Sequence, residues 1–141
     1  MRILLLQPPW PEGQVGFHRV TMPDPLPLEL IAAPLLEENE IEILDMRLEP
    51  DKLNETLLRF QPNMVGTTGY TCDVLLNQEI LHQVKQTDPK IFTVVGGHHA
   101  SLIPADFNSP DVDTIVTSEG EETFTELVNA LNAGQEWRTV P

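Results

Sequence analysis

The chain has 141 residues, of which 40% are hydrophobic, so it can bury one core and is not a disordered chain. Its net charge of −14, with only 8 lysines and arginines, argues against a surface that binds nucleic acid or an anionic membrane. A single cysteine, Cys72, excludes an internal disulfide and an iron–sulfur cluster held by this chain alone, and it is consistent with the cytoplasm.

Five short apolar runs alternate along the chain with segments of helical periodicity. The predicted strands are residues 3–6, 41–44, 64–66, 91–95 and 114–116. The predicted helices are residues 28–38, 52–60, 73–85 and 121–133. Uninterrupted apolar strands suit a parallel sheet that is covered on both faces. The alternation therefore predicts an α/β fold: a flavodoxin-like (Rossmann-like) three-layer sandwich whose five parallel strands follow the common order 2-1-3-4-5.

Prolines, glycines and asparagines punctuate this pattern. Pro34 is expected to kink or shorten the first helix, and Asn39 to end it in a left-handed conformation. Gly134 lies just beyond the last predicted helix. No apolar run approaches the roughly 20 residues of a membrane span. Residues 7–27 have no hydrophobic period and follow the first strand, so they belong to the sheet edge where open α/β folds bind ligands.

The residues that follow the strands exclude several familiar ligands. The stretch Gln7-Pro8-Pro9-Trp10 lacks the hydroxyls and glycines of a flavin-phosphate cradle, and the chain has no G-x-G-x-x-G for a dinucleotide. The third strand ends in Gly66-Thr67-Thr68-Gly69-Tyr70 rather than in the aspartate of a phospho-acceptor domain. The fourth ends in Gly96-Gly97-His98-His99, where paired glycines permit close approach to the backbone. These ends predict a slot for a flat or tail-like polar ligand.

Five stretches, in order along nearly the whole chain, carry a resemblance to a known family: residues 2–9, 28–33, 40–45, 95–100 and 112–124. The most specific feature is Gly-Gly-His-His followed about twenty residues later by Ser-Glu-Gly-Glu-Glu. With these stretches the chain resembles the N-terminal cobalamin-binding domain of cobalamin-dependent radical S-adenosylmethionine enzymes. That group includes the anaerobic magnesium-protoporphyrin ester cyclases and hopanoid-associated proteins.

The resemblance implies a cobalamin whose nucleotide tail is threaded into the domain and whose corrin ring lies on the carboxyl edge of the sheet. Thr67, Thr68, Gly96 and Gly97 match positions that line the tail pocket, and residues 118–120 match the loop that closes it. Trp10, Phe17 and Tyr70 are candidates for covering the corrin faces or a partner surface. The full set of cofactor-binding candidates is Gln7, Pro8, Pro9, Trp10, Thr67, Thr68, Gly69, Tyr70, Gly96, Gly97, His98, Ser118, Glu119 and Gly120.

Two departures refine the resemblance. Cobalamin domains of the mutase type carry Asp-x-His-x-x-Gly after the first strand, but this chain has no histidine there, and His18 is too far along. We therefore expect cobalamin to bind with its own base displaced and without a protein imidazole on cobalt. The chain also lacks the C-x-x-x-C-x-x-C of the radical family. The iron–sulfur cluster and S-adenosylmethionine are thus expected in a downstream barrel, and residues 1–141 to be a truncated domain that is not catalytic alone.

Other interpretations remain open for several residues. Adjacent His98 and His99 should point apart, and no third ligand lies at a recognisable spacing, which argues against a dedicated metal site. Thr117 or Ser118 could cap the last helix. Cys72 is interpreted as a buried small residue near a helix start rather than a catalytic thiol.

Two other functional classes compete with the cobalamin domain. The first is a flavodoxin-like binding or regulatory module that has lost cobalamin, with which the missing histidine is compatible. The second is a self-sufficient enzyme, for which the sequence offers no nucleophile–base pair and no phosphate loop. In the full-length protein, a cobalamin domain would serve a methyltransferase or an oxidative cyclase.

Overall fold

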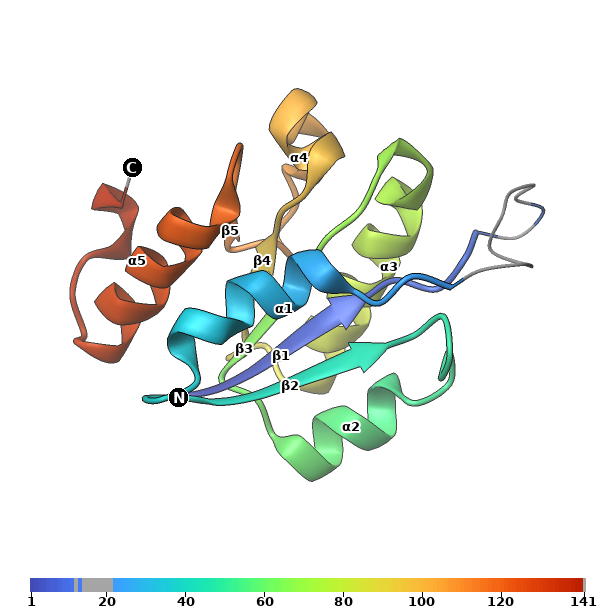
Figure 1. The fold of residues 1–141 in the computed structure, drawn as a ribbon. Helices are drawn as coiled ribbons and strands as arrows, with labels where there is room; N and C mark the ends of the chain where they lie inside the picture. Colours follow the sequence, from blue (N-terminus) through green and yellow to red (C-terminus); the bar gives the residue numbers. More distant parts are fainter. Residues whose placement is uncertain (12, 14–21, 141) are drawn as a thin grey trace.

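The computed structural model describes residues 1–11, 13 and 22–140, and its centre is a five-stranded sheet (Figure 1). The strand order is β2-β1-β3-β4-β5, and every neighbouring pair is parallel. The strands are β1 (Arg2–Gln7), β2 (Glu40–Asp45), β3 (Met64–Thr67), β4 (Phe92–Val95) and β5 (Thr114–Ile115). The predicted α/β fold and its strand order are confirmed.

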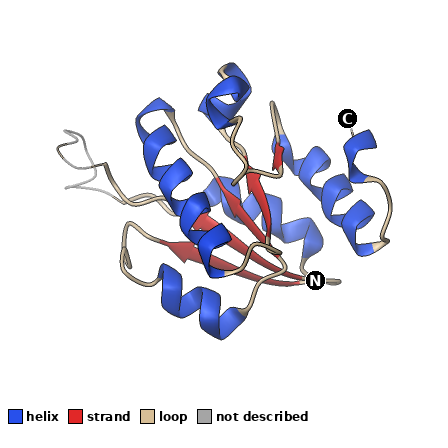
Figure 2. Ribbon diagram, turned by 180° about the vertical axis from the view of Figure 1, so that it is seen from behind, coloured by secondary structure: helices blue, strands red, loops and turns tan. Residues whose placement is uncertain are grey.

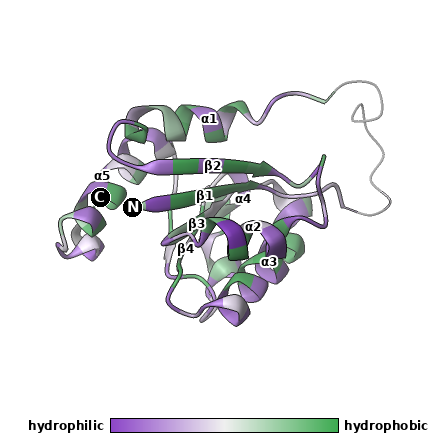
Figure 3. Ribbon diagram, turned by 90° about the horizontal axis from the view of Figure 1, so that it is seen from below, coloured by the Kyte–Doolittle hydropathy of each residue, from purple (hydrophilic) through white to green (hydrophobic). Residues whose placement is uncertain are grey.

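Helices cover both faces of the sheet, which makes three layers (Figures 2 and 3). The α-helices are α1 (Leu26–Ala32), α2 (Leu53–Phe60), α3 (Val74–Thr87), α4 (His98–Leu102) and α5 (Gly120–Asn132). The 3₁₀ turns are η2 (Ala33–Leu35), η3 (Thr71–Asp73), η4 (Pro104–Phe107) and η5 (Trp137–Thr139). Helices α1 and α5 pack on one face, and α2, α3 and the short α4 pack on the other. No helix in the described part of the chain combines the length and apolarity needed to cross a membrane.

Strand β1 explains why the predicted strands read as uninterrupted apolar runs. Leu4 and Leu6 pack into the core beneath α2 and α3, whereas Ile3 and Leu5 pack into the core beneath α1 and α5. All four are at most 2% exposed. Burying each such side chain contributes about 1.5–3 kcal/mol, so both faces of the strand must be apolar.

The helix boundaries follow the punctuation residues in most places. Helix α1 ends at Ala32 and continues only as a 3₁₀ turn that contains Pro34, as expected from a residue without a backbone donor. Gly134 adopts a φ of +63°, and its N–H donates to Leu131 O at 3.1 Å while Gln135 N–H donates to Ala130 O at 2.9 Å. This pair of bonds is the Schellman arrangement that ends α5.

Two predictions about secondary structure are wrong. Asn39 is not left-handed: its side-chain Nδ2 instead donates to Leu35 O at 3.0 Å. A non-glycine residue does end a helix in this conformation elsewhere, namely Gln61 at the end of α2, with a φ of +49°. The sequence analysis also missed α4 and η4, which occupy the place of the fourth crossover helix. Helix α4 has only five residues, too few to show a helical period.

Candidate functional site

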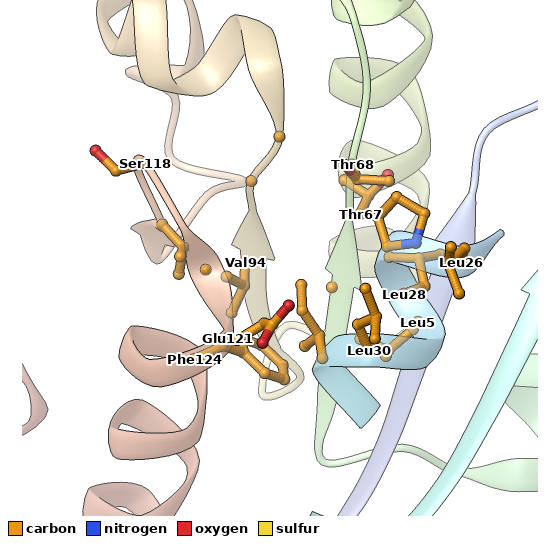
Figure 4. Close-up of a pocket in the computed structure, with 17 residues that line it drawn as sticks. Leu5, Leu26, Leu28, Leu30, Thr67, Thr68, Val94, Ser118, Glu121 and Phe124 are labelled. Carbon is orange, nitrogen blue, oxygen red and sulfur yellow. The ribbon is translucent and has the colours of Figure 1, made fainter. Parts of the chain in front are cut away.

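Two adjoining cavities open at the carboxyl edge of the sheet. The first, which we call the slot, has a volume of about 270 Å³ and lies between α1 and α5, above the ends of β3 and β4 (Figure 4). The second, which we call the rim cavity, has a volume of about 360 Å³ and lies between the segment after β1 and the turn after β3. Both are lined by Pro27, Thr68 and Gly97, so the two cavities meet at these residues.

The slot has mostly apolar walls. Its apolar side chains come from the two helices that flank it and from three strands or strand ends: Leu5, Leu26, Pro27, Leu28, Leu30, Ile31, Val94, Val116 and Phe124. Its polar groups are few, and Figure 4 shows Ser118 and Thr68 near its upper end and Glu121 near Phe124. An apolar cleft with a small number of polar groups is the usual form of a cofactor site.

Gly96 keeps the slot open. Side chains alternate along a strand, so residue 96 would point to the same side as Val94, which lines the slot, and away from the side of Val95. A Cβ built on Gly96 would have its nearest neighbours at 3.5 Å (Val116 O) and 3.8 Å (Val116 Cβ). These are ordinary contacts, so a larger side chain at this position would enter the slot rather than disturb the sheet.

Gly97 is required for a different reason, the close approach of two turns. Its φ of +95° and ψ of −171° lie in a region that is essentially limited to glycine. A Cβ there would lie 2.5 Å from Thr68 Oγ1 and 2.9 Å from Gly69 N. The turn after β4 is thereby pressed against the turn after β3, and His99 N–H donates to Gly69 O across them at 3.3 Å.

The two threonines at the end of β3 have different roles. Thr67 is 4% exposed, and its hydroxyl donates to Asn77 Oδ1 at 2.5 Å. Asn77, which is 1% exposed, donates from Nδ2 to Thr68 O at 3.3 Å and so fixes the turn. The Thr68 hydroxyl has no hydrogen bond to the described residues and lines both cavities. Thr68 is therefore the threonine whose hydroxyl is available to a ligand.

The connection from β5 to α5 forms the far wall of the slot. Ser118 is left-handed at φ +61°, and its N–H donates to Ser101 Oγ at 2.8 Å. The residue at the N-cap of α5 is Glu119, without a side-chain capping bond, so the prediction that Thr117 or Ser118 caps this helix is wrong. Ser118 and Gly120 line the slot, whereas Glu119 lines neither cavity.

The rim cavity gathers the polar and aromatic residues of three strand ends. Tyr70, which is 67% exposed, lies after β3, and its ring centroid is 6.0 Å from that of His98. The ring of Trp10 lies beneath the guanidinium of Arg47, whose carbon is 5.5 Å from the ring centroid. Arg47 also forms an ion pair with Asp45 at 2.6 Å.

The Asp45–Arg47 pair shifts the pKa of both groups. Burial alone would raise the pKa of Asp45, but the hydrogen bonds and positive charge of Arg47 outweigh it, so the pKa lies below its ordinary value. The hydrogen bonds that Arg47 donates to Asp45 likewise raise the pKa of Arg47, which stays charged. Because the folded pKa of Asp45 is depressed, its contribution to stability is present above the unfolded pKa and is lost as the pH falls through the folded pKa.

We expect Asp45→Asn to lower the urea midpoint at neutral pH, and the difference from wild type to shrink below the ordinary pKa of 3.8. The measurement is urea unfolding of both proteins from pH 7 to pH 2.5. Glu55→Gln is the matched control, because it removes an ion pair with Lys52 whose side chains are 64% and 46% exposed. A difference for Asp45→Asn that is independent of pH would contradict the assignment.

Cys72 also lies at the rim cavity. The residue lies near a helix start, as predicted, in the turn η3 just before α3. It is exposed there, so the prediction that it is buried is wrong. Partial burial of the thiol and then the adjacent Asp73 carboxylate raise its pKa. We expect alkylation by iodoacetamide to be slow at pH 7 and to reach half its maximal rate above pH 9.0, the ordinary thiol value for this group. A fast reaction at pH 7 would instead reveal an activated thiol.

The two histidines after Gly97 point apart, as predicted. His98 is exposed and lines the rim cavity. His99 is 3% exposed, and its ring nitrogens are bonded to Thr71 Oγ1 at 3.0 Å and Asp106 Oδ2 at 2.9 Å. Within the described residues, no three His, Cys, Asp or Glu side chains lie together in a way that could hold a metal ion.

The structure brings nearly all of the sequence-predicted site residues to the two cavities. The slot is lined by Thr67, Thr68, Gly96, Gly97, Ser118 and Gly120. The rim cavity is lined by Gln7, Pro8, Pro9, Trp10, Thr68, Gly69, Tyr70, Gly97 and His98. Phe17 and His18 lie outside the described residues. Sequence reasoning missed the apolar walls of the slot and Arg47. Arg47 could have been found, because it lies two residues after Asp45, at the end of a predicted strand.

Comparison with known proteins identifies the family of this chain. The model of the B12 binding domain matches residues 16–128. The chain belongs to the B12-binding domain family. It is 31% identical over 99% of its length to an uncharacterized methyltransferase of Pyrococcus horikoshii, and 35% identical over 59% of its length to the anaerobic magnesium-protoporphyrin IX monomethyl ester cyclase of Cereibacter sphaeroides.

A solved structure shares the fold of this B12-binding domain. The cobalamin-dependent S-adenosylmethionine radical enzyme OxsB, with aqua-cobalamin bound, superposes on 99% of the chain with a TM-score of 0.77 at 20% identity. The chain spans only 31% of the Pyrococcus methyltransferase, 14% of the Cereibacter cyclase and 20% of OxsB. The domain therefore corresponds to one part of much longer proteins.

Proposed function

We propose that this domain holds cobalamin for a radical S-adenosylmethionine enzyme of the methyltransferase or oxidative cyclase class. The observation that carries the proposal is the slot: a cavity of about 270 Å³ with apolar walls, kept open by Gly96 at the end of β4. The tail pocket implied by the sequence resemblance has the same position and the same glycines. The residues present thus fit the group.

In this proposal the nucleotide tail occupies the slot. Its aromatic base would pack against Val94, Val116 and Phe124, which are all at most 6% exposed, and the Thr68 hydroxyl would donate to a polar group of the tail. A base buried in the slot cannot also reach cobalt, so cobalamin is bound with its base displaced. Residues 7–10 contain no histidine to replace it.

The corrin ring would then face the rim cavity. Trp10, Tyr70 and His98 are the side chains of three different strand ends that lie there. Bound cobalamin supplies a cobalt centre that can carry a methyl group or assist radical chemistry, and the domain contributes its position and surroundings. The cluster and S-adenosylmethionine would be held by a region downstream of residue 141, in a cytoplasmic enzyme.

The test is to mix the purified domain with hydroxocobalamin, remove free ligand by desalting, and record the visible spectrum at neutral and acidic pH. We expect cobalamin to be retained with a base-displaced spectrum already at neutral pH. An unrelated acidic protein of similar size is the control for nonspecific retention. A base-on spectrum would overturn the threaded tail. If no colour follows the protein, even with the downstream region attached, the alternative holds: a flavodoxin-like binding or regulatory module that has lost cobalamin.

A further inference from the structure

Arg47 is a buried cation at the wall of the rim cavity. Its side chain is 6% exposed, although it lies at a surface loop just beyond β2. Burying a guanidinium is costly unless its N–H donors form hydrogen bonds. Two of the three side-chain nitrogens of Arg47 do so within the described residues.

Two nitrogens of Arg47 are bonded within the protein. Nε donates to Asp45 Oδ1 at 2.8 Å, and Nη2 donates to Asp45 Oδ2 at 2.6 Å and to Pro23 O at 2.9 Å. The face of the guanidinium lies over the Trp10 ring. Asp45, Pro23 and Trp10 thus hold the planar group in one orientation from three different segments.

The third nitrogen, Nη1, has no hydrogen bond among the described residues, and Arg47 lines the rim cavity. It is therefore a rigidly oriented donor with no acceptor among the described residues, on a side chain that is only 6% exposed. The ion pair with Asp45 has no net charge, so it does not attract an anion to the cavity in preference to a neutral acceptor. Asp24 and Asp73, which also line the cavity, disfavour an anion further.

We infer that Arg47 is a ligand-binding residue whose Nη1 donates to the carbonyl oxygen of a carboxamide side chain on the edge of a corrin ring. This inference rests on the proposed function. Corrin rings of the cobalamin type carry neutral carboxamides around their periphery, which are acceptors of the required chemistry. The rim cavity adjoins the slot at Thr68 and Gly97, so a ligand whose tail fills the slot would bring its ring to Arg47.

The test pairs a change in the protein with a change in the ligand. The protein variant is the double substitution Asp45→Asn with Arg47→Met, which removes the guanidinium without leaving an unpaired carboxylate. The ligands are cobalamin and the isomeric cobalamin monocarboxylic acids, each with one propionamide converted to a carboxylate. A charge-assisted bond to Arg47 is stronger than a neutral one, so one isomer should lose roughly fivefold to tenfold more affinity than cobalamin does when Arg47 is removed.

The losses of affinity measured for the separate isomers decide whether Arg47 contacts one particular amide. A loss confined to one isomer places a direct contact at that amide, whereas an equal loss for all isomers reflects only the field of the charge and overturns the inference. Arg47→Lys is the second variant, which keeps the charge but not Nη1, and the isomer-specific preference should fall in it too. If wild type does not retain cobalamin, the proposed function fails. If wild type retains it without isomer-specific coupling, only the role of Arg47 fails.

Discussion

Gly96→Val is expected to abolish cobalamin retention while leaving the domain folded. A Cβ at this position meets Val116 only at 3.5 Å or beyond, and the backbone of Gly96 is not left-handed, so the sheet accepts a side chain there. The two added methyl groups would extend into the slot, where the apolar walls leave about 270 Å³. Because packed interiors yield little to an inserted group, we expect an affinity loss on the order of 100-fold or more.

The measurement is equilibrium binding of hydroxocobalamin to wild type, Gly96→Ala and Gly96→Val. The alanine variant should lose less, because its Cβ makes only ordinary contacts. Cobinamide, a corrin that lacks the nucleotide tail, is the ligand control: it should bind wild type and Gly96→Val equally. Undiminished cobalamin binding by Gly96→Val, with the domain folded, would mean that the tail does not occupy the slot.

The strands were predictable because burial on both faces leaves uninterrupted apolar runs in the sequence, whereas their order was predicted as the common one for five such strands. Leu4 and Leu6 pack into one core, and Ile3 and Leu5 pack into the other. The sequence of β1 is therefore apolar without a polar interruption at these positions. The short α4 left no such trace, since five residues make little more than one helical turn. Its position is set by the turn at Gly97, a tertiary feature.

The candidate site was predictable to the extent that it lies at strand ends. Thr68 and Gly97 follow neighbouring strands of a parallel sheet, so the topology alone brings them together. The wall formed by Phe124 was not predictable in this way, because its helical period marks a buried face but not which strand ends that face will meet. Glu119 shows the limit: it stands between two residues that line the slot, Ser118 and Gly120, yet lines neither cavity.

Gly97→Ala is expected to destabilise the domain itself, in contrast to the neighbouring glycine. The backbone at φ +95° and ψ −171° is strained for any residue with a Cβ, and the added carbon would lie 2.5 Å from Thr68 Oγ1 and 2.9 Å from Gly69 N. The second contact is with backbone and cannot be relieved by a side-chain rotation. Strain and overlap together predict a loss of about 2–4 kcal/mol in the free energy of unfolding.

Urea unfolding of wild type, Gly97→Ala and Gly96→Ala decides this point. Gly96→Ala is the matched control, because the two positions are adjacent and differ only in backbone conformation and in what a Cβ would meet. Its midpoint should stay near that of wild type, within about 1 kcal/mol. Equal midpoints for all three proteins would show that the turns after β3 and β4 can separate at little cost. The slot and the rim cavity would then share a movable boundary at Gly97, instead of the fixed one that its geometry indicates.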